Sequence, residues 1–214
     1  MALRRRSIRR AATPCRQFDP AFPVGACLSR PSDGWSTLAD VTASVIVISG
    51  SMGCGKTTVL GEASDLLSAA GLAHGTIDLD AIATALLPGD VARDLVFRNL
   101  EAIYRNFLST GITRVLISEP VENRDELDRL RRAMPGAELV VCRLTASLET
   151  MRSRLRTREP GMLQEQFLAR AAELDHLLDS AGVEDFAIAN DGRSITDVAR
   201  ELLERAGWVR PADC

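Results

Sequence analysis

A run of β-branched residues feeds directly into a glycine-rich segment near residue 50. Val45-Ile46-Val47-Ile48 is followed by Gly50-Ser51-Met52-Gly53-Cys54-Gly55-Lys56-Thr57, after which apolar residues recur at helical spacing as far as Ala70. Lys56 is the single lysine of the 214-residue chain, in which arginine supplies every other long cation. The segment therefore predicts a buried strand, a tight glycine turn and a helix that opens at the turn.

The spacing within this segment fits G-x-x-x-x-G-K-[ST], the phosphate-binding P-loop. Backbone N–H groups of such a loop converge on phosphate oxygens, and the helix that follows adds the positive end of its dipole. An ammonium on a flexible stem acts there as a compact point charge, which a planar guanidinium does not. We expect Lys56 to reach the β- and γ-phosphates and Thr57 to offer its hydroxyl to Mg²⁺. The loop residues expected to bind nucleotide are Gly50, Ser51, Met52, Gly53, Cys54, Gly55, Lys56 and Thr57.

After the loop, short apolar β-type runs alternate with longer segments of helical periodicity. We expect strands at residues 45–48, 75–78, 114–119, 138–142 and 185–189. Helices are expected at residues 57–70, 91–108, 124–132, 147–157 and 163–180, and from Ser194 to Gly207. This alternation predicts an α/β fold of three layers, a five-stranded parallel sheet with helices on both faces. Ligands in such sheets bind beyond the carboxyl ends of the strands.

Acidic residues stand where two of these strands end. Asp78 and Asp80 share one side of an extended segment, because alternate residues of a strand face the same way. One could hold Mg²⁺ and the other accept the proton of a substrate hydroxyl, and the residues do not decide which. The alternative is that Asp80 caps a helix starting near Ala81. Glu119 is similar to the Walker B carboxylate that holds metal or orients water, the alternative being a solvated loop glutamate.

Arg154 and Arg158 stand one turn apart on the helix expected at residues 147–157. Arginines near a phosphate site neutralise the charge that spreads over a transferring phosphoryl group. Glu159-Pro160-Gly161 breaks the helix next to them, where a lid could hinge. A solvated basic face is the alternative reading, and we prefer it for Arg152 and Arg156. The expected catalytic residues are thus Lys56, Asp78, Asp80, Arg154 and Arg158, and the expected metal ligands Thr57, Asp78 and Glu119.

Charge divides the chain into a basic start and an acidic remainder. Residues 1–43 hold seven arginines and three aspartates, whereas the whole chain has a net charge of −3. We expect residues 1–43 to be a disordered tail, residues 44–208 the domain, and residues 209–214 a short C-terminal tail. Three interpretations of the basic tail stay open: an arm for anionic partners, an organelle presequence, or translation from upstream of the true start.

Composition also excludes several classes of function. The tail lacks a long apolar run, so neither a signal peptide nor a membrane span is expected. The five cysteines are odd in number and lack metal-ligand spacing, so we expect no disulfide framework or zinc site and a cytoplasmic location. Aromatic residues are scarce and do not alternate with basic ones, which argues against nucleic-acid binding.

From Ser44 to about Trp208 the chain resembles the P-loop kinase superfamily, which includes adenylate, gluconate, shikimate and adenylylsulfate kinases and chloramphenicol phosphotransferases. The resemblance rests on the P-loop, Ile77-Asp78-x-Asp80, Glu119, Leu144-x-x-Ser147, and Arg154-Leu155 with Arg158. It implies the strand order 2-3-1-4-5 and a small lid around Arg154 to Gly161. It also implies that Thr58 contacts the α-phosphate and that Asn190-Asp191-Gly192-Arg193 lies against adenine.

Two departures leave the subfamily open. Glu119-Pro120-Val121-Glu122 replaces the glycine-rich stretch of shikimate kinases, and Ala83 stands where adenylylsulfate kinases usually carry an arginine. The expected function is an ATP- and Mg²⁺-dependent kinase whose partner is a small-molecule acceptor: a metabolite, a nucleoside or an antibiotic. The alternatives are a P-loop ATPase or nucleotide-sensing regulator, and a nucleotide-binding protein whose lid no longer catalyses.

Overall fold

The computed structural model of the chain describes residues 42–83 and 85–210. The basic tail expected at residues 1–43 lies outside the described residues except for its last two, and so do residues 211–214 of the C-terminal tail. The strands are β1 (Ala43–Ser49), β2 (Gly75–Asp78), β3 (Arg114–Ser118), β4 (Ala137–Thr145) and β5 (Phe186–Ala189). The α-helices are α1 (Lys56–Ala69), α2 (Gly89–Ser109), α3 (Arg124–Ala133), α4 (Leu148–Arg158), α5 (Gln164–Ala181) and α6 (Ile195–Arg205).

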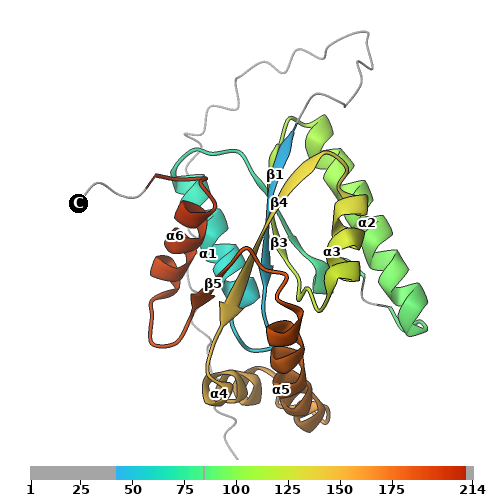
Figure 1. Cartoon of the computed structure of the whole chain (residues 1–214), viewed down its shortest axis with the longest axis vertical. Coiled ribbons are helices and arrows are strands. Elements are labelled where there is room, and N and C mark those ends of the chain that lie inside the picture. The colour runs from blue at the N-terminus through green and yellow to red at the C-terminus, as the bar shows by residue number, and fades with distance from the viewer. Residues whose placement is uncertain (1–41, 84, 211–214) are drawn as a thin grey trace, which may run out of the picture. The chain divides into compact units, whose positions relative to one another are not determined.

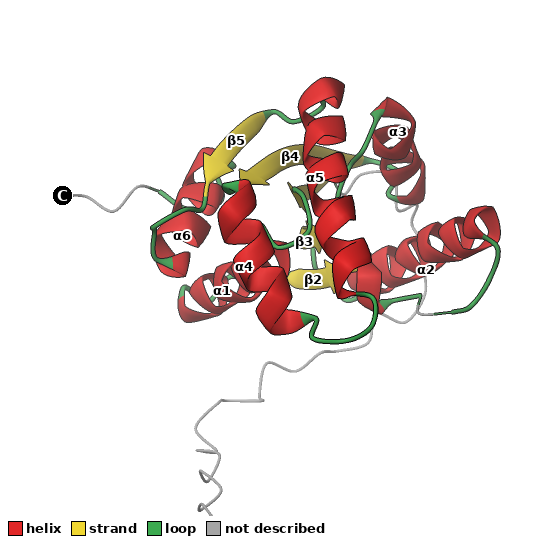
Figure 2. Ribbon diagram, turned by 90° about the horizontal axis from the view of Figure 1, so that it is seen from below, coloured by secondary structure: helices red, strands yellow, loops and turns green. Residues whose placement is uncertain are grey.

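The five strands form one parallel sheet in the order β2-β3-β1-β4-β5, so the predicted fold class and strand order are confirmed. In the central strand, Ile46 pairs with Leu116 of β3 on one side and with Val140 of β4 on the other. Helices α1 and α6 cover one face of the sheet and α2 and α3 the other (Figure 1). Helices α4 and α5 lie beyond the carboxyl ends of the strands, the end that faces the viewer in Figure 2.

The central strand is apolar throughout because both of its faces are buried. Ile46 and Ile48 pack into the cluster that α1 and α6 close, whereas Val45 and Val47 pack into the cluster under α2 and α3. All four side chains are fully buried. Because β1 is packed on both faces, it fixes the position of the loop that follows it.

Local signals in the sequence place most helix ends correctly. Ser194 caps α6, as predicted, because its hydroxyl oxygen accepts from the backbone N–H of Asp197 at 3.1 Å. Helix α4 ends at Arg158, immediately before the predicted break at Glu159-Pro160-Gly161. Strand β4 continues to Thr145, three residues beyond the end expected from the apolar run. None of the described helices is both long and apolar enough to cross a membrane.

A buried arginine fastens α5 to the sheet. Arg143 on β4 is 4% exposed, and its guanidinium donates to Asp179 at 2.6 Å and to Asp175 at 3.0 Å. Both aspartates belong to α5, so a charge buried under the helix is neutralised by the helix itself. Helix α5 also backs the P-loop, because the Ser51 hydroxyl donates to the carbonyl oxygen of Ala171 at 2.6 Å.

We expect Arg143→Ala to lower the free energy of unfolding by about 2–3 kcal/mol, because it empties a buried site and separates Asp175 and Asp179 from their counter-charge. The control is Arg131→Ala, which removes an exposed pair with Asp128. That variant is expected to lose less than about 1 kcal/mol. Urea unfolding of the three proteins measures both values, and equal losses would contradict an anchoring role for Arg143.

Candidate active site

The P-loop depends on glycine at positions that no side chain can occupy. Gly50 has a φ of 142°, and a Cβ built there would lie 2.5 Å from the carbonyl oxygen of Leu144. At Gly53 a Cβ would lie 2.7 Å from the carbonyl oxygen of Met151 on α4. The loop thus lies in backbone-to-backbone contact with β4 and α4, which a larger residue would push apart.

Gly50→Ala is expected to cost about 2 kcal/mol or more of folding stability, because alanine is strained at this φ and meets fixed backbone. Gly61→Ala is the matched control, since Gly61 lies inside α1 with open space around its Cα. That change should be neutral or stabilise by up to about 1 kcal/mol. Thermal unfolding compares the two variants; equal melting temperatures would show that the loop tolerates a side chain.

The start of α1 is prepared for an anion. Its N-cap is Gly55, which contributes no side-chain cap, and its first turn contains no acidic residue. The backbone N–H groups and the helix dipole are therefore not neutralised by the chain itself. Lys56 folds back over the loop, with Nζ donating to the carbonyl oxygens of Gly50 at 2.9 Å and Ser51 at 3.1 Å. This geometry places one positive charge and several donors around the same loop.

Thr57 and Asp78 meet beside the loop. The Thr57 hydroxyl donates to Asp78 Oδ2 at 2.9 Å, which joins the first turn of α1 to the end of β2. The two oxygens come from residues predicted as metal ligands, and Mg²⁺ in phosphate sites takes one or two protein oxygens beside phosphate and water. Among the described residues, no cluster of three or more His, Cys, Asp or Glu side chains forms a metal cage.

The structure corrects the expectation for the segment Asp78 to Asp80. The extended backbone ends at Asp78, and residues Leu79–Ala81 form a 3₁₀ turn. Asp78, not Asp80, caps this turn, since its Oδ1 accepts from the backbone N–H of Asp80 at 3.3 Å. The alternation argument for two carboxylates on one face of a strand was therefore wrong. The side chain of Asp80 itself is exposed, and its carboxylate has no hydrogen bond within the described residues.

Glu119 directly follows β3. Among the described residues, it forms no hydrogen bond with Thr57 or Asp78. It is 3% exposed, and its Oε1 accepts from Arg93 Nη1 at 2.6 Å. The second nitrogen of Arg93 donates to Glu126 at the same distance. Burial raises the pKa of Glu119 to about 7, although Arg93 favours the carboxylate, and the charge of Asp80 adds to the rise. Asp80 and Glu119 therefore share one electrostatic environment.

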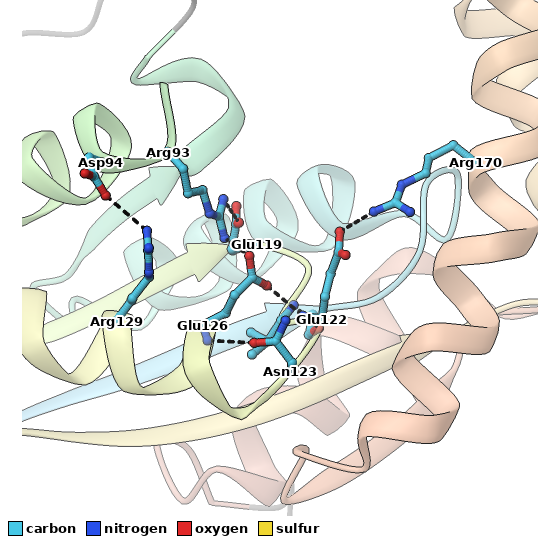
Figure 3. A network of polar contacts seen from close by, with 10 residues as sticks. Arg93, Asp94, Glu119, Glu122, Asn123, Glu126, Arg129 and Arg170 are labelled. Atoms are coloured by element: carbon cyan, nitrogen blue, oxygen red, sulfur yellow. Dashed lines mark hydrogen bonds and ion pairs between the residues drawn. The ribbon is translucent and has the colours of Figure 1, made fainter. Parts of the chain in front are cut away.

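Sequence reasoning missed Arg93, although a signal for it exists. Arg93 precedes Phe97, Leu100 and Tyr104 at helical spacing, so it lies in phase with the inward face of α2. A charged side chain on the inward face of a helix needs an oppositely charged partner near the end of the apolar stripe. Here Arg93 reaches Glu119 and lies over the ring of Phe97, 4.9 Å from its centroid. Figure 3 shows it together with the other residues of this network.

On the other side of the loop, toward β5, six of the predicted residues line a cavity of about 310 Å³. Arg154 donates to the carbonyl oxygens of Gly53, Cys54 and Asn190 at 3.0 to 3.3 Å. Asn190 is fully buried, and its Nδ2 donates to the carbonyl oxygen of Cys54 at 2.7 Å. The residues that line the cavity are Gly53, Gly55, Thr58, Arg154, Arg158, Asn190 and Ile195.

Two predicted residues stand apart from this cavity. Arg193 pairs with Glu201 of α6 at 2.7 Å and with the carbonyl oxygen of Ala189. Met52 is partly buried and packs against the cluster of Leu155, Leu168 and Ala171. A wider hollow of about 410 Å³, between α2 and α3, is lined by residues such as Phe97 and Arg129 and by none of the P-loop.

Cys54 lies within the loop but is not prepared for thiol chemistry. It is fully buried, and burial raises the pKa of its thiol, although Lys56 nearby favours the thiolate. Cys54 therefore acts in the structure as a small residue that fits a tight loop. His74 is half-buried with both ring nitrogens occupied, by the hydroxyl of Ser64 and the carbonyl oxygen of Leu72, so it also has a structural role.

No family model matches the chain, and no curated protein matches it by sequence. Solved structures do match. A gluconokinase from Sinorhizobium meliloti 1021 is 23% identical with a TM-score of 0.53, over 77% of this chain and 92% of that one. The APS kinase of Mycobacterium tuberculosis, solved with AMPPNP and APS, is 19% identical with a TM-score of 0.53, over 76% and 96%. The tunicamycin resistance protein of Deinococcus radiodurans is 18% identical with a TM-score of 0.54, over 78% and 97%. The chain therefore has the fold of the P-loop kinases.

Proposed function

We propose that the protein is an ATP- and Mg²⁺-dependent phosphotransferase that moves the γ-phosphoryl group of ATP to a hydroxyl of a small molecule. The observation that carries this proposal is the arrangement around the P-loop: a lysine inside the loop, the Thr57–Asp78 pair at its edge, and the exposed carboxylate of Asp80 beyond that pair. Phosphoryl transfer needs these groups: a cation on the phosphates, a metal ligand and an acceptor for a proton.

The nucleotide fits the loop and the cavity beside it. Phosphate oxygens would bind the N–H groups at the start of α1, and the base would enter the cavity next to Thr58 and Asn190. Asn190 Oδ1 is buried without a hydrogen-bond partner among the described residues, so the site holds an acceptor suited to an amine of the base. Arg154, held by three carbonyls, would shape this cavity. Within the described part of the chain, Arg158 pairs with the adjacent Glu159 alone, at the surface, so it is better placed to turn toward phosphate.

Mg²⁺ fits the edge of the loop near Thr57 and Asp78. When bound, the ion would neutralise charge on the β- and γ-phosphate oxygens. The hydrogen bond from Thr57 to Asp78 already aligns the two oxygens that would hold it, directly or through water. Glu119 is a poorer ligand than the sequence predicted, because its carboxylate is bound to Arg93.

Asp80 is the better candidate for the general base. Both carboxylate oxygens of Asp78 accept hydrogen bonds, one from the Thr57 hydroxyl and one from the backbone of the 3₁₀ turn. The carboxylate of Asp80 accepts none within the described residues. A base must be within reach of the acceptor hydroxyl and accessible to it, and Asp80 is exposed. The ATPase alternative would use Glu119 to orient water, and the burial and pairing of Glu119 argue against it.

The test is to incubate the protein with Mg²⁺ and ATP labelled on the γ-phosphate, alone and with a metabolite extract. Mass spectrometry then follows the label. We expect a new labelled small molecule that forms only when extract and protein are both present. Label that appears solely as inorganic phosphate, at a rate unchanged by the extract, would support the ATPase alternative instead.

A further inference from the structure

The acceptor side of the proposed site can be located from the nucleotide side. The cavity that suits the base lies toward β5, near Thr58 and Asn190. The Thr57–Asp78 pair lies toward β2, on the opposite side of the loop, because β2 and β5 are the two edges of the sheet. The γ-phosphate must therefore point toward Asp80 and the segment after β3, and the acceptor must bind there.

The first cation on that side is already paired with two carboxylates. Arg93 bridges Glu119 and Glu126, with both contacts at 2.6 Å. The oxygen of Glu126 that Arg93 does not bind accepts from the backbone N–H of Glu122 at 2.8 Å, which fixes the segment between β3 and α3. Arg93 is also held over Phe97. Releasing its guanidinium to an anionic ligand would break two charge-assisted hydrogen bonds at once.

The second cation is occupied in the same way. Arg170 of α5 bridges Glu122 at 2.6 Å and Glu173 at 3.1 Å. It belongs to this side because Glu122, its partner at 2.6 Å, lies in the segment after β3. Figure 3 shows Arg93 and Arg170 approaching the segment after β3 from opposite helices, each with its guanidinium on a glutamate.

Negative charge is thus in excess beside the expected acceptor. Each arginine carries two glutamates, and Asp80 adds a carboxylate that no arginine of the described chain neutralises. A carboxylate or phosphate on the acceptor would meet this excess while the two arginines that contact the segment after β3, Arg93 and Arg170, are already paired with glutamates, and this costs affinity.

We infer that the acceptor is a hydroxyl compound without an anionic group, either uncharged, as in a sugar or nucleoside, or carrying a protonated amine. The inference rests on the proposed function and narrows its substrate class. Glu119, Glu122 and Glu126 disfavour an anionic acceptor, because they pair with Arg93 and Arg170 and keep the two guanidinium groups away from the ligand.

The experiment separates a metabolite extract on ion exchangers into anionic, neutral and cationic fractions. Each fraction is incubated with the full-length protein, Mg²⁺ and γ-labelled ATP. Labelled product from the neutral or cationic fraction is expected, and product from the anionic fraction alone would overturn the inference while leaving the phosphotransferase proposal intact. Label that appears in no product from any fraction would overturn the proposed function, and the inference with it.

A variant tests the cause of the selectivity. Glu122→Gln removes one charge and loosens Arg170, so labelled product from the anionic fraction is expected to rise about tenfold relative to wild type. Glu101→Gln is the matched control, since Glu101 forms its ion pair with Arg105, one turn further along α2, and not with Arg93 or Arg170. That variant should leave the distribution of label unchanged. An anionic share that stays constant in Glu122→Gln would show that the paired arginines do not set the preference.

Discussion

Replacing Lys56 with alanine is expected to reduce phosphoryl transfer by about 10³-fold or more. Lys56 is the single lysine of the chain, and its Nζ lies against two carbonyl oxygens of the loop, Gly50 and Ser51. No other ammonium can take its place. The measurement is the rate of label transfer at saturating ATP and Mg²⁺, with circular dichroism to show that the fold survives.

Lys56→Arg is the informative companion to this variant. A planar guanidinium cannot settle at 2.9 and 3.1 Å from two carbonyl oxygens of one tight loop while also reaching a phosphate. The arginine variant should therefore stay close to the alanine variant in rate. Recovery of most of the wild-type rate would mean that only positive charge matters there, and that the compact ammonium does not explain why lysine persists at this position.

Asp80→Asn is expected to lower kcat by about 10²–10⁴-fold, the usual contribution of a general base. ATP binding should stay close to wild type, because the nucleotide contacts proposed for the loop and cavity do not include Asp80. Asp78→Asn should behave differently. It disturbs the Thr57 contact and the cap of the 3₁₀ turn, so the Mg²⁺ concentration needed for half-maximal rate should rise.

Steady-state kinetics at several Mg²⁺ concentrations, with ATP binding measured by calorimetry, separate these two variants. Asp65→Asn, on an exposed position of α1, controls for the loss of one negative charge. If Asp80→Asn keeps a nearly normal kcat, Asp80 is not the base.

Local chemistry explains why much of the fold could be predicted from sequence. Val45 to Ile48 is apolar on both faces, which only a central strand of a covered sheet requires, and the glycines that follow mark a loop that approaches neighbouring backbone. The strand order came from the family resemblance and not from the periodicity, because no local pattern states which strand lies beside which. The strand and the loop could be predicted because they depend on interactions within a few residues, and the strand order could be predicted because the topology of the family is known.

The parts of the site that escaped prediction depend on partners distant in sequence. Glu119 looked like a metal ligand because it ends a strand, yet its partner Arg93 lies 26 residues earlier on a helix. After Asp78 the backbone forms a 3₁₀ turn in place of an extended segment, because the Asp78 carboxylate accepts a hydrogen bond from the backbone N–H of Asp80. An aspartate allows such a turn but does not require it, so the sequence alone does not predict it. The contact of Arg193 with adenine stays a prediction, and in the structure Arg193 pairs with Glu201 on the helix that follows it.

Helix α5 touches both halves of the proposed site. The carbonyl oxygen of Ala171 in α5 accepts a hydrogen bond from the Ser51 hydroxyl of the P-loop. Arg170, the residue before Ala171, pairs with Glu122 on the proposed acceptor side. The same helix is pinned underneath by Arg143. If the protein has the proposed function, a displacement of α5 that widened the entrance for the acceptor would also remove a contact that supports the phosphate-binding loop. Substitutions at the buried contacts of α5 are therefore expected to change the affinity for both proposed substrates together.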